Sequence, residues 1–434
     1  MLLSNVSAYF AFLVFAAGII ESCSKKNQPA ATGATLFSFE PAAGARGQFV
    51  KIDGTNFSAA AADNLVFFNN ISAVVTSATP NSLVAVVPDG AGSGKISVEI
   101  NGQKEISANT FDYLLSVSTL AGDGSFGSRD GQGKSAQFYL PFGGGVDAAG
   151  NIYVADQGNN LIRKLSPGGL VATVAGNGTR GFADGNALEA QFSSPYDVAA
   201  DASGNLYVTD GNRIRKISTA GIVSTIAGND TSAFADGPGA VAKFNSPAGI
   251  TLDASGNIYV ADQSNNRIRK ISPDGLVSTI AGNGVDGFRD GAAADAEFGL
   301  PFGVAVDASG NVYVSDLENL RIRKISGAGS VSTLAGTSTT GYKDGNAATA
   351  EFGSTLGISV DGSGNVYVAD GINNVIRKID PSGTVSTFAG DGKEGGNEAP
   401  VSSAEFRSPA DILVGGNGTF YVIDYLNNRV CKIL

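Results

Sequence analysis

Residues 249–280 read GITLDASGNIYVADQSNNRIRKISPDGLVSTI, and this stretch decides the fold. Short runs rich in Val, Ile and Tyr occupy 249–252, 258–261, 267–271 and 277–280, and such runs are typical of β-strands. Asp, Asn, Gly and Pro, which favour turns, separate the runs. The stretch therefore predicts four antiparallel strands joined by tight turns.

The same stretch recurs along the chain from residue 117 to residue 434. The tyrosine of its second strand stands at Tyr153, Tyr207, Tyr259, Tyr313, Tyr367 and Tyr421. A four-stranded unit of this kind cannot bury both of its faces alone, so neighbouring units must supply the core. Six such units predict a six-bladed β-propeller.

The ends of the repeat region predict how the ring closes. The last unit stops at Leu434, after its third strand, whereas a surplus strand, 117–121, precedes the first unit. We expect 117–121 to pair with 428–433, because the shared blade removes an exposed strand edge.

Residues 35–114 predict a second, smaller β domain. Alternation of apolar and polar residues is visible at 49–52 and 96–100, and Gly, Pro and Asn break the strands. Several short strands in such a segment indicate an antiparallel sandwich. The fold class is therefore all-β, with an N-terminal Ig-like sandwich followed by a six-bladed propeller at 117–434.

Both regions resemble known families. Pro41, Gly44, the run 52–57, the run 66–68, Pro88 and the run 94–98 carry a resemblance to IPT/TIG domains. Residues 117–434 resemble NHL repeats, whose pattern is Pro-x-Gly-Val-x-Val-Asp-x-x-Gly-Asn-x-Tyr-Val-x-Asp-x-x-Asn-x-Arg-Ile. The combination is similar to bacterial exported proteins that join an IPT/TIG module to NHL repeats.

The N-terminus predicts export. Residues 7–20 form one apolar stretch, which is too short to span a bilayer but has the length of a signal-peptide core. Cys23 follows a small residue, and this resembles the cleavage box of bacterial lipoproteins. We expect 1–23 to be a lipoprotein-type signal with lipid attached at Cys23, and 24–34 to be a flexible linker; a plain signal peptide or short anchor is the alternative. The chain would then be anchored to the bacterial envelope, on the periplasmic or the surface face of the outer membrane.

Composition excludes several functions. The 434 residues contain no histidine, so a Ser-His-Asp triad, a Cys-His pair and His-ligated zinc are ruled out. The formal net charge is −11, which argues against a nucleic-acid partner.

One aspartate ends the second strand of every unit, and these form a candidate metal site: Asp156, Asp210, Asp262, Asp316, Asp370 and Asp424. Six carboxylates around one axis could bind Ca²⁺ through oxygen ligands. The alternative is structural, with each carboxylate accepting backbone N–H groups or pairing with a repeat arginine.

A candidate ligand-binding site lies where the repeat varies, at one mouth of the channel. Aromatic residues follow the repeat proline in three units, at Phe142, Tyr196 and Phe302. The position just past the aspartate also varies, and supplies Gln157, Gln263 and Tyr425. An uneven aromatic set at a channel mouth is suited to a sugar or an apolar peptide side chain; tolerant surface packing is the alternative.

Together these features favour a non-catalytic binding or scaffolding protein of the cell envelope. Its partner would be an envelope protein or a glycan on the loop face of the propeller, the chain would be a monomer, and the lipid anchor would be its contact with the membrane. The alternative is a Ca²⁺-dependent, lactonase-like hydrolase or a lyase at the propeller channel, which the resemblance allows. Because the related enzymes typically use histidine with a metal, binding is the favoured interpretation.

Overall fold

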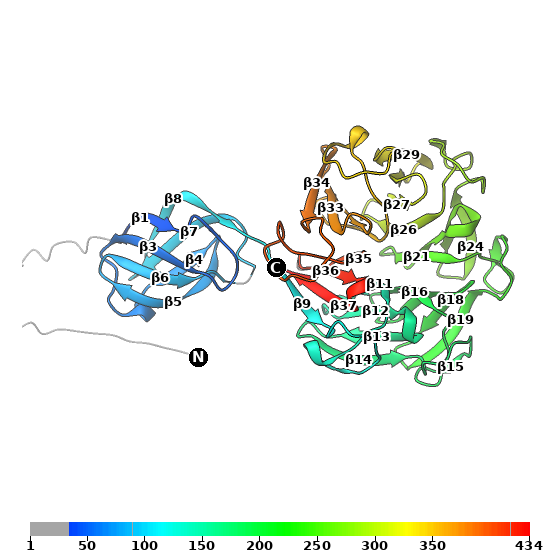
Figure 1. Cartoon of the computed structure of the whole chain (residues 1–434), viewed down its shortest axis with the longest axis horizontal. Coiled ribbons are helices and arrows are strands. Elements are labelled where there is room, and N and C mark those ends of the chain that lie inside the picture. The colour runs from blue at the N-terminus through cyan, green and yellow to red at the C-terminus, as the bar shows by residue number, and fades with distance from the viewer. Residues whose placement is uncertain (1–33, 89, 417) are drawn as a thin grey trace, which may run out of the picture.

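A computed structural model describes residues 34–434, with residues 89 and 417 left out. The expected signal segment 1–23, its Cys23 and all but the last residue of the linker 24–34 therefore lie outside the described residues. Within the described part, the predicted all-β class is confirmed: an N-terminal sandwich-like sheet leads into a ring of six blades (Figure 1). No helix among these residues is long and apolar enough to cross a membrane.

The N-terminal domain is built from eight strands in one continuous hydrogen-bonded order, β1-β3-β6-β5-β4-β7-β8-β2. Its elements are β1 (Thr35–Glu40), β2 (Ala43–Gly44), β3 (Phe49–Thr55), η1 (Ala61–Asp63), β4 (Leu65–Phe68), β5 (Ile71–Thr79), β6 (Ser82–Val86), β7 (Gly94–Ile100) and β8 (Gln103–Tyr113). Alternate residues of these strands point inward, and Val50, Ile52 and Phe111 are buried in a single core. The period-two pattern of the sequence thus becomes the inside and outside of the sandwich.

The first three blades follow the predicted strand order. Blade 1 comprises β11 (Pro141–Val146), β12 (Ile152–Asp156), η3 (Gln157–Asn159), β13 (Leu161–Leu165) and β14 (Leu170–Ala175). Blade 2 comprises β16 (Pro195–Ala200), β17 (Leu206–Asp210), β18 (Arg213–Ile217) and β19 (Ile222–Gly228). Blade 3 comprises β21 (Pro247–Leu252), β22 (Ile258–Asp262), η4 (Gln263–Asn265), β23 (Arg267–Ile271) and β24 (Leu276–Ala281).

The other three blades complete the ring. Blade 4 comprises β26 (Pro301–Val306), β27 (Val312–Asp316), β28 (Arg321–Ile325) and β29 (Ser330–Ala335). Blade 5 comprises β31 (Ile358–Val360), β32 (Val366–Asp370), β33 (Val375–Ile379) and β34 (Thr384–Ala389). Blade 6 comprises β35 (Pro409–Val414), β36 (Phe420–Asp424), η6 (Tyr425–Asn427), β37 (Arg429–Ile433) and β9 (Val117–Ala121).

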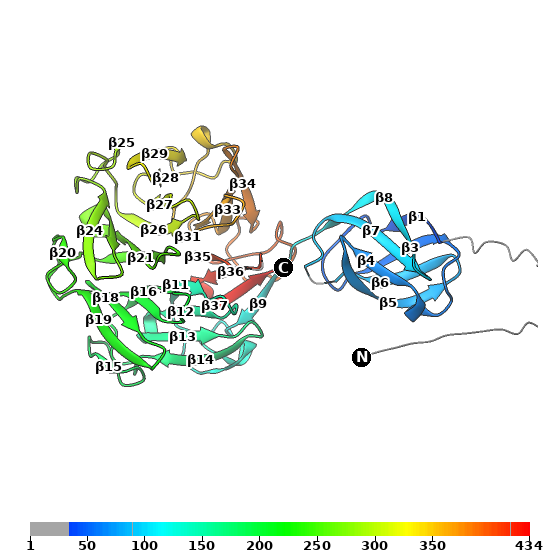
Figure 2. The ribbon, with the colours of Figure 1, turned by 180° about the vertical axis from the view of Figure 1, so that it is seen from behind.

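The strand β9 closes the ring, because it pairs antiparallel with β37 and so joins the two ends of the repeat region (Figure 2). Ser116 and Leu434 also exchange backbone hydrogen bonds of 2.8 and 3.1 Å. Across the closure, Ile423 and Val430 of blade 6 pack with Val154 of blade 1.

The outer edge of the blades differs from the expectation of four strands. In blades 1 to 5 the loop that leads into the blade adds a fifth strand of two residues, and a single 3-10 turn follows two of these additions. The elements are β10 (Gly131–Gln132), η2 (Gly133–Ser135), β15 (Gly185–Asn186), β20 (Gly237–Pro238), β25 (Gly291–Ala292), β30 (Gly345–Asn346) and η5 (Ala347–Thr349). The long inter-blade loop is therefore partly a strand edge.

The core of the propeller lies between blades. Tyr153 and Ile162 of blade 1 pack with Val208 and Ile217 of blade 2, and Phe192 of the intervening loop is fully buried among them. Burying such a side chain contributes about 1.5–3 kcal/mol. The equivalent loop phenylalanines are all buried: Phe138, Phe192, Phe244, Phe298, Phe352 and Phe406.

The turn between the first two strands shows why the repeat keeps Asp and Gly. Asp147 Oδ1 accepts hydrogen bonds from the backbone N–H groups of Ala149 and Asn151, at 3.0 and 2.8 Å. Gly150 has a φ of +80°, in the left-handed region that favours glycine. Tyr153 donates its hydroxyl to the same carboxylate, which ties the turn to the strand. The turn thereby fixes β11 against β12 in blade 1.

Candidate ligand-binding site at the propeller channel

The six repeated aspartates are fully buried, and each lies on its own blade in an ion pair with an arginine. The pairs are Asp156–Arg163, Asp210–Arg215, Asp262–Arg269, Asp316–Arg323, Asp370–Arg377 and Asp424–Arg429, with N–O distances between 2.6 and 3.2 Å. Each also accepts a backbone N–H from the preceding loop, as Asp262 does from Asn245 at 2.8 Å. The arrangement is the structural alternative considered from the sequence.

The structure does not bring these carboxylates together for Ca²⁺. Among the residues described, there is no group of three or more Asp, Glu, Cys or His side chains that could hold a metal ion. Burial raises the pKa of Asp156 to about 6, although Arg163 beside it acts in the opposite direction. The carboxylate is therefore ionised at neutral pH and occupied by the guanidinium.

Blade 6 forms the same ion pair with an arginine at a different position of its third strand. Cys431 stands where the other blades have arginine, and it is fully buried. Arg429, two residues earlier, donates its Nε to Asp424 at 2.7 Å instead. The pair thus persists in all six blades, which indicates that it holds the fold.

Four of the predicted mouth residues meet in one aromatic cluster, formed by Phe142, Tyr196, Phe302 and Tyr425. The Phe142 ring centre lies 5.0 Å from that of Tyr196, 5.5 Å from that of Phe302 and 5.1 Å from that of Tyr425. The rings are inclined by 49–66°, a tilted to edge-on packing that aromatic pairs prefer. Side chains from blades 1, 2, 4 and 6 therefore converge over one end of the channel.

Gln157 and Gln263 lie differently. They begin the 3-10 turns η3 and η4, after the second strands of blades 1 and 3. Neither is among the residues that line the channel cavity. The structure therefore places these two glutamines outside the lining of the channel cavity.

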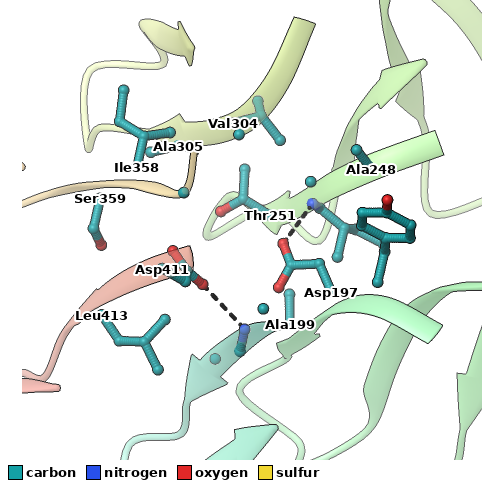
Figure 3. Close-up of a pocket in the computed structure, with 18 of the residues that line it drawn as sticks. Asp197, Ala199, Ala248, Thr251, Val304, Ala305, Ile358, Ser359, Asp411 and Leu413 are labelled. Atoms are coloured by element: carbon teal, nitrogen blue, oxygen red, sulfur yellow. Dashed lines mark hydrogen bonds between the residues drawn. The ribbon is translucent and has the colours of Figure 1, made fainter. Parts of the chain in front are cut away.

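The channel contains a cavity of about 230 Å³ that is lined by the innermost strands of the blades (Figure 3). Phe142, Tyr196 and Phe302 line it where these strands begin, and the lining continues to Ser359 and Val414 near their other end. Of the described residues that line the cavity, none is lysine or arginine.

Two carboxylates that the sequence interpretation missed face this cavity. Asp197 and Asp411 occupy the glycine position of the Pro-x-Gly pattern in blades 2 and 6, whereas the other blades have Gly143, Gly249, Gly303 and Gly357 there. This break in the repeat was the available signal, because a site that breaks the symmetry of its scaffold stands out against six copies.

Each of these carboxylates bridges two innermost strands. Asp197 accepts a hydrogen bond from Val198 at 2.8 Å and another from Ile250 of blade 3 at 2.9 Å. Asp411 likewise accepts from Ile412 at 2.8 Å and from Gly144 of blade 1 at 3.1 Å. The bridges hold both carboxylates in fixed positions, as Figure 3 shows for the inter-blade contacts.

The neighbouring glycines make room for the carboxylates. A Cβ added at Gly143 would lie 2.5 Å from Asp197 Oδ1, and a Cβ at Gly357 would collide with Asp411 Oδ1. Any other residue at these two positions would displace the carboxylate beside it.

The two carboxyls are also coupled electrically. Burial raises the pKa of Asp197 to about 7. Burial, together with the charge of Asp197, raises the pKa of Asp411 well above its usual range. Near neutral pH the pair is therefore poised between protonated and ionised forms.

Known families match both parts of the chain. The IPT/TIG domain matches residues 35–113, the Teneurin NHL domain matches 178–240, and the NHL repeat matches 244–271 and 298–325. The chain thus joins an IPT/TIG domain to NHL repeats that form a six-bladed β-propeller.

The chain is also similar to individual proteins. It is 30% identical over 282 residues to Protein SUPPRESSOR OF QUENCHING 1, chloroplastic, of Arabidopsis thaliana, which covers 60% of this chain and 27% of that protein. It is 30% identical over 341 residues to NHL repeat-containing protein 2 of Gallus gallus, covering 66% of this chain and 46% of that protein. The chain thus spans less than half the length of these curated relatives.

Among solved structures, an auxiliary nutrient binding protein from Bacteroides ovatus is similar in fold. The TM-score is 0.63 at 17% identity, and the match covers 93% of this chain and 98% of that one. At this identity the likeness shows the fold alone.

Proposed function

We propose that this chain is a non-catalytic binding protein that recognises a glycan or a protein on the loop face of its propeller. The contact surface is here named the aromatic mouth. It consists of Phe126, Tyr139, Phe142, Tyr196, Phe302 and Tyr425.

The observation that carries this proposal is the convergence of aromatic rings from four blades at one mouth. The repeat does not specify these rings, since Ala248, Leu356 and Ala410 occupy the position after the repeat proline or its equivalent in the other blades. Aromatic rings offer large contact areas at small entropic cost, and tyrosine adds a hydroxyl at the edge.

The outer part of the mouth is accessible to a partner. The side chain of Phe126 is 75% exposed and that of Tyr139 is 40% exposed, and their ring centres lie 5.8 Å apart. Burial raises the pKa of the Tyr425 hydroxyl, and the neighbouring Tyr196 and Tyr139 raise that pKa further. The exposed pair therefore extends the aromatic cluster outward, and the mixed apolar and hydroxyl surface suits the faces of sugar rings.

The enzymatic alternative has one observation in its favour, the Asp197–Asp411 pair in the channel. Ca²⁺ in proteins takes about six to eight oxygen ligands, and the side chains that line this cavity supply two carboxylates. Each carboxylate oxygen that would bind the ion already accepts a backbone hydrogen bond. Binding is therefore the function that the geometry supports best.

We further propose that the chain is exported, that it is lipidated at Cys23 and that it acts as a monomer in the bacterial envelope. The apolar stretch 7–20 ahead of Cys23 supports this placement. Labelling cells with a radioactive fatty acid checks it: the chain should carry the label, Cys23→Ser should not, and equal labelling of both would contradict the anchor.

The binding proposal is tested with a glycan array and an envelope pull-down. The full chain should retain a defined glycan or protein partner, and Phe126→Ala with Tyr139→Ala should lower its affinity at least tenfold. Phe142→Ala, Tyr196→Ala and Phe302→Ala test the inner rings. Phe49→Ala, on the N-terminal domain and 63% exposed, is the matched control and should bind normally. Binding that survives all the mouth substitutions would reject the aromatic mouth.

A further inference from the structure

The channel cavity holds two acidic side chains without the arginine partners that the repeated aspartates have. Seven aspartates are buried among the described residues, and six of them pair with arginine. Asp411 is the seventh; within the described part of the chain it has no ion pair, and it faces the same cavity as Asp197. Since a buried carboxylate without a counter-charge is costly, a cation in this cavity would stabilise both groups.

The cavity also presents aromatic rings to such a cation. Phe142, Tyr196 and Phe302 line one end of the cavity, and the two carboxylates also belong to its lining. Aromatic ring faces attract cations, most strongly where water is excluded, and cages of such rings recognise quaternary ammonium groups. Carboxylates and aromatic rings around the same cavity therefore favour an organic cation as its ligand.

The volume of the cavity and the number of its carboxylates restrict further which ligand can bind there. A cavity of about 230 Å³ lies below the ~300–1,000 Å³ of pockets for drug-sized ligands, so the occupant is small. A hard metal ion needs more oxygen ligands than the two carboxylates supply. An organic ammonium ion needs only the negative charge and the rings.

We propose that the channel cavity binds a small organic ammonium ion, with Asp197 and Asp411 supplying the charge and Phe142, Tyr196 and Phe302 supplying the aromatic wall. The position of the two aspartates supports a role in binding, because four blades build the same strand with glycine. This site shares Phe142, Tyr196 and Phe302 with the aromatic mouth, but it adds Asp197 and Asp411 inside the channel and so accepts a different class of ligand.

Choline chloride and its uncharged isostere 3,3-dimethylbutan-1-ol form a matched pair of probes. Titration calorimetry on the full chain at pH 8 should show saturable choline binding in the millimolar range or tighter. The isostere should bind at least tenfold more weakly. Equal binding of the two probes, or no choline binding up to about 50 mM, would overturn the proposal.

Substitutions of the two aspartates test whether they supply the negative charge that binds choline. Asp411→Asn and Asp197→Asn keep the shape of the side chain and should each lower choline affinity at least fivefold, whereas the weak binding of the isostere should not change. Asp295→Asn, an exposed loop aspartate, is the matched control. Thermal melting confirms that each variant folds, and a folded Asp197→Asn/Asp411→Asn chain that binds choline like the wild type would refute the site.

A pH series and a calcium competition test two other points: whether binding depends on the carboxylates, and whether the cavity binds a metal ion instead. The titratable side chains that line the cavity are Asp197, Asp411 and Tyr196. Choline affinity should rise from pH 5.5 to pH 8 as Asp197, whose pKa is about 7, ionises, and it should stay flat in the double Asn variant. Calcium chloride at 5 mM should leave choline binding unchanged; displacement by calcium would assign the cavity to a metal instead.

Discussion

Two sets of aspartates lie in this propeller, and they differ in how the chain repeats them. The outer set occurs once in every blade, and each member pairs with an arginine of its own blade. It consists of Asp156, Asp210, Asp262, Asp316, Asp370 and Asp424. The inner set, Asp197 and Asp411, occurs in two blades and faces a cavity that no lysine or arginine lines among the described residues. An aspartate that occurs in all six blades stabilises the fold that the blades share. An aspartate that occurs in only two blades is not required by that fold, and it can bind a ligand instead.

Removal of the closing strand should have the largest effect on stability. Without residues 117–121, β37 loses its partner strand and the apolar contacts between blades 6 and 1 are exposed. We expect the propeller to lose its cooperative thermal transition or to melt at least 15 °C lower. A deletion variant that melts like the wild type in calorimetry would show that the ring does not depend on this closure.

Breaking one repeated ion pair should have the next largest effect. Asp262→Ala leaves Arg269 fully buried without its carboxylate partner, although Asp236 still contacts that guanidinium. Such a loss costs about 3–5 kcal/mol of unfolding free energy. Denaturant titration checks the value, with Asp295→Ala as the exposed control that should change stability by less than about 0.5 kcal/mol. A loss below about 1 kcal/mol would mean that the repeated pair does not hold the blade.

The pH dependence of stability should report on the Asp197–Asp411 pair when wild type and variant are compared. The pKa of Asp197 is about 7 in the folded chain, above the ~3.9 of an unfolded aspartate, so folding favours its protonated form. This contribution is present in full below about pH 4 and is lost as pH rises through about 7.

The unfolding free energy of the wild type should therefore fall between pH 4.5 and pH 8. On the order of 2 kcal/mol of that fall should disappear in the Asp197→Asn/Asp411→Asn variant, after allowance for solvent in the cavity. Identical pH profiles for wild type and variant would contradict the coupled pair.

Calcium should have the smallest effect. The repeated carboxylates are already occupied by guanidinium groups, and the described residues hold no cluster of three or more metal-binding side chains. The melting temperature in 5 mM CaCl₂ should agree with that in EDTA within about 1 °C, since stabilisation by a ligand requires that it bind the folded state. A rise of several degrees would revive the calcium-dependent alternative.

Much of the fold could be predicted from one repeat unit. The runs 249–252, 258–261, 267–271 and 277–280 lie within β21, β22, β23 and β24, because Asp, Asn and Gly mark every turn. The two-residue outer strands escaped prediction. A segment such as Gly185–Asn186 has no apolar alternation, and it is extended only because the edge of β19 lies beside it.

The candidate site was less accessible to sequence reasoning. The aromatic residues at 142, 196 and 302 could be placed near one mouth, but their contacts depend on ring closure, which brings blades 1, 2, 4 and 6 together. Asp197 and Asp411 were visible as breaks in Pro-x-Gly. Their shared cavity was not, since they are 214 positions apart (411 − 197) and meet across the intervening blade 1.

The central claim is that repeated positions build the ring and that unrepeated positions bind. The double variant Asp197→Gly/Asp411→Gly restores the residue that four blades already carry, and it tests this claim in one preparation. Both its unfolding free energy and its choline affinity are measured. The unfolding free energy should stay within about 2 kcal/mol of the wild type, while the affinity for choline should fall at least tenfold. A variant that unfolds as readily as Asp262→Ala, or one that keeps the wild-type affinity for choline, would contradict the account.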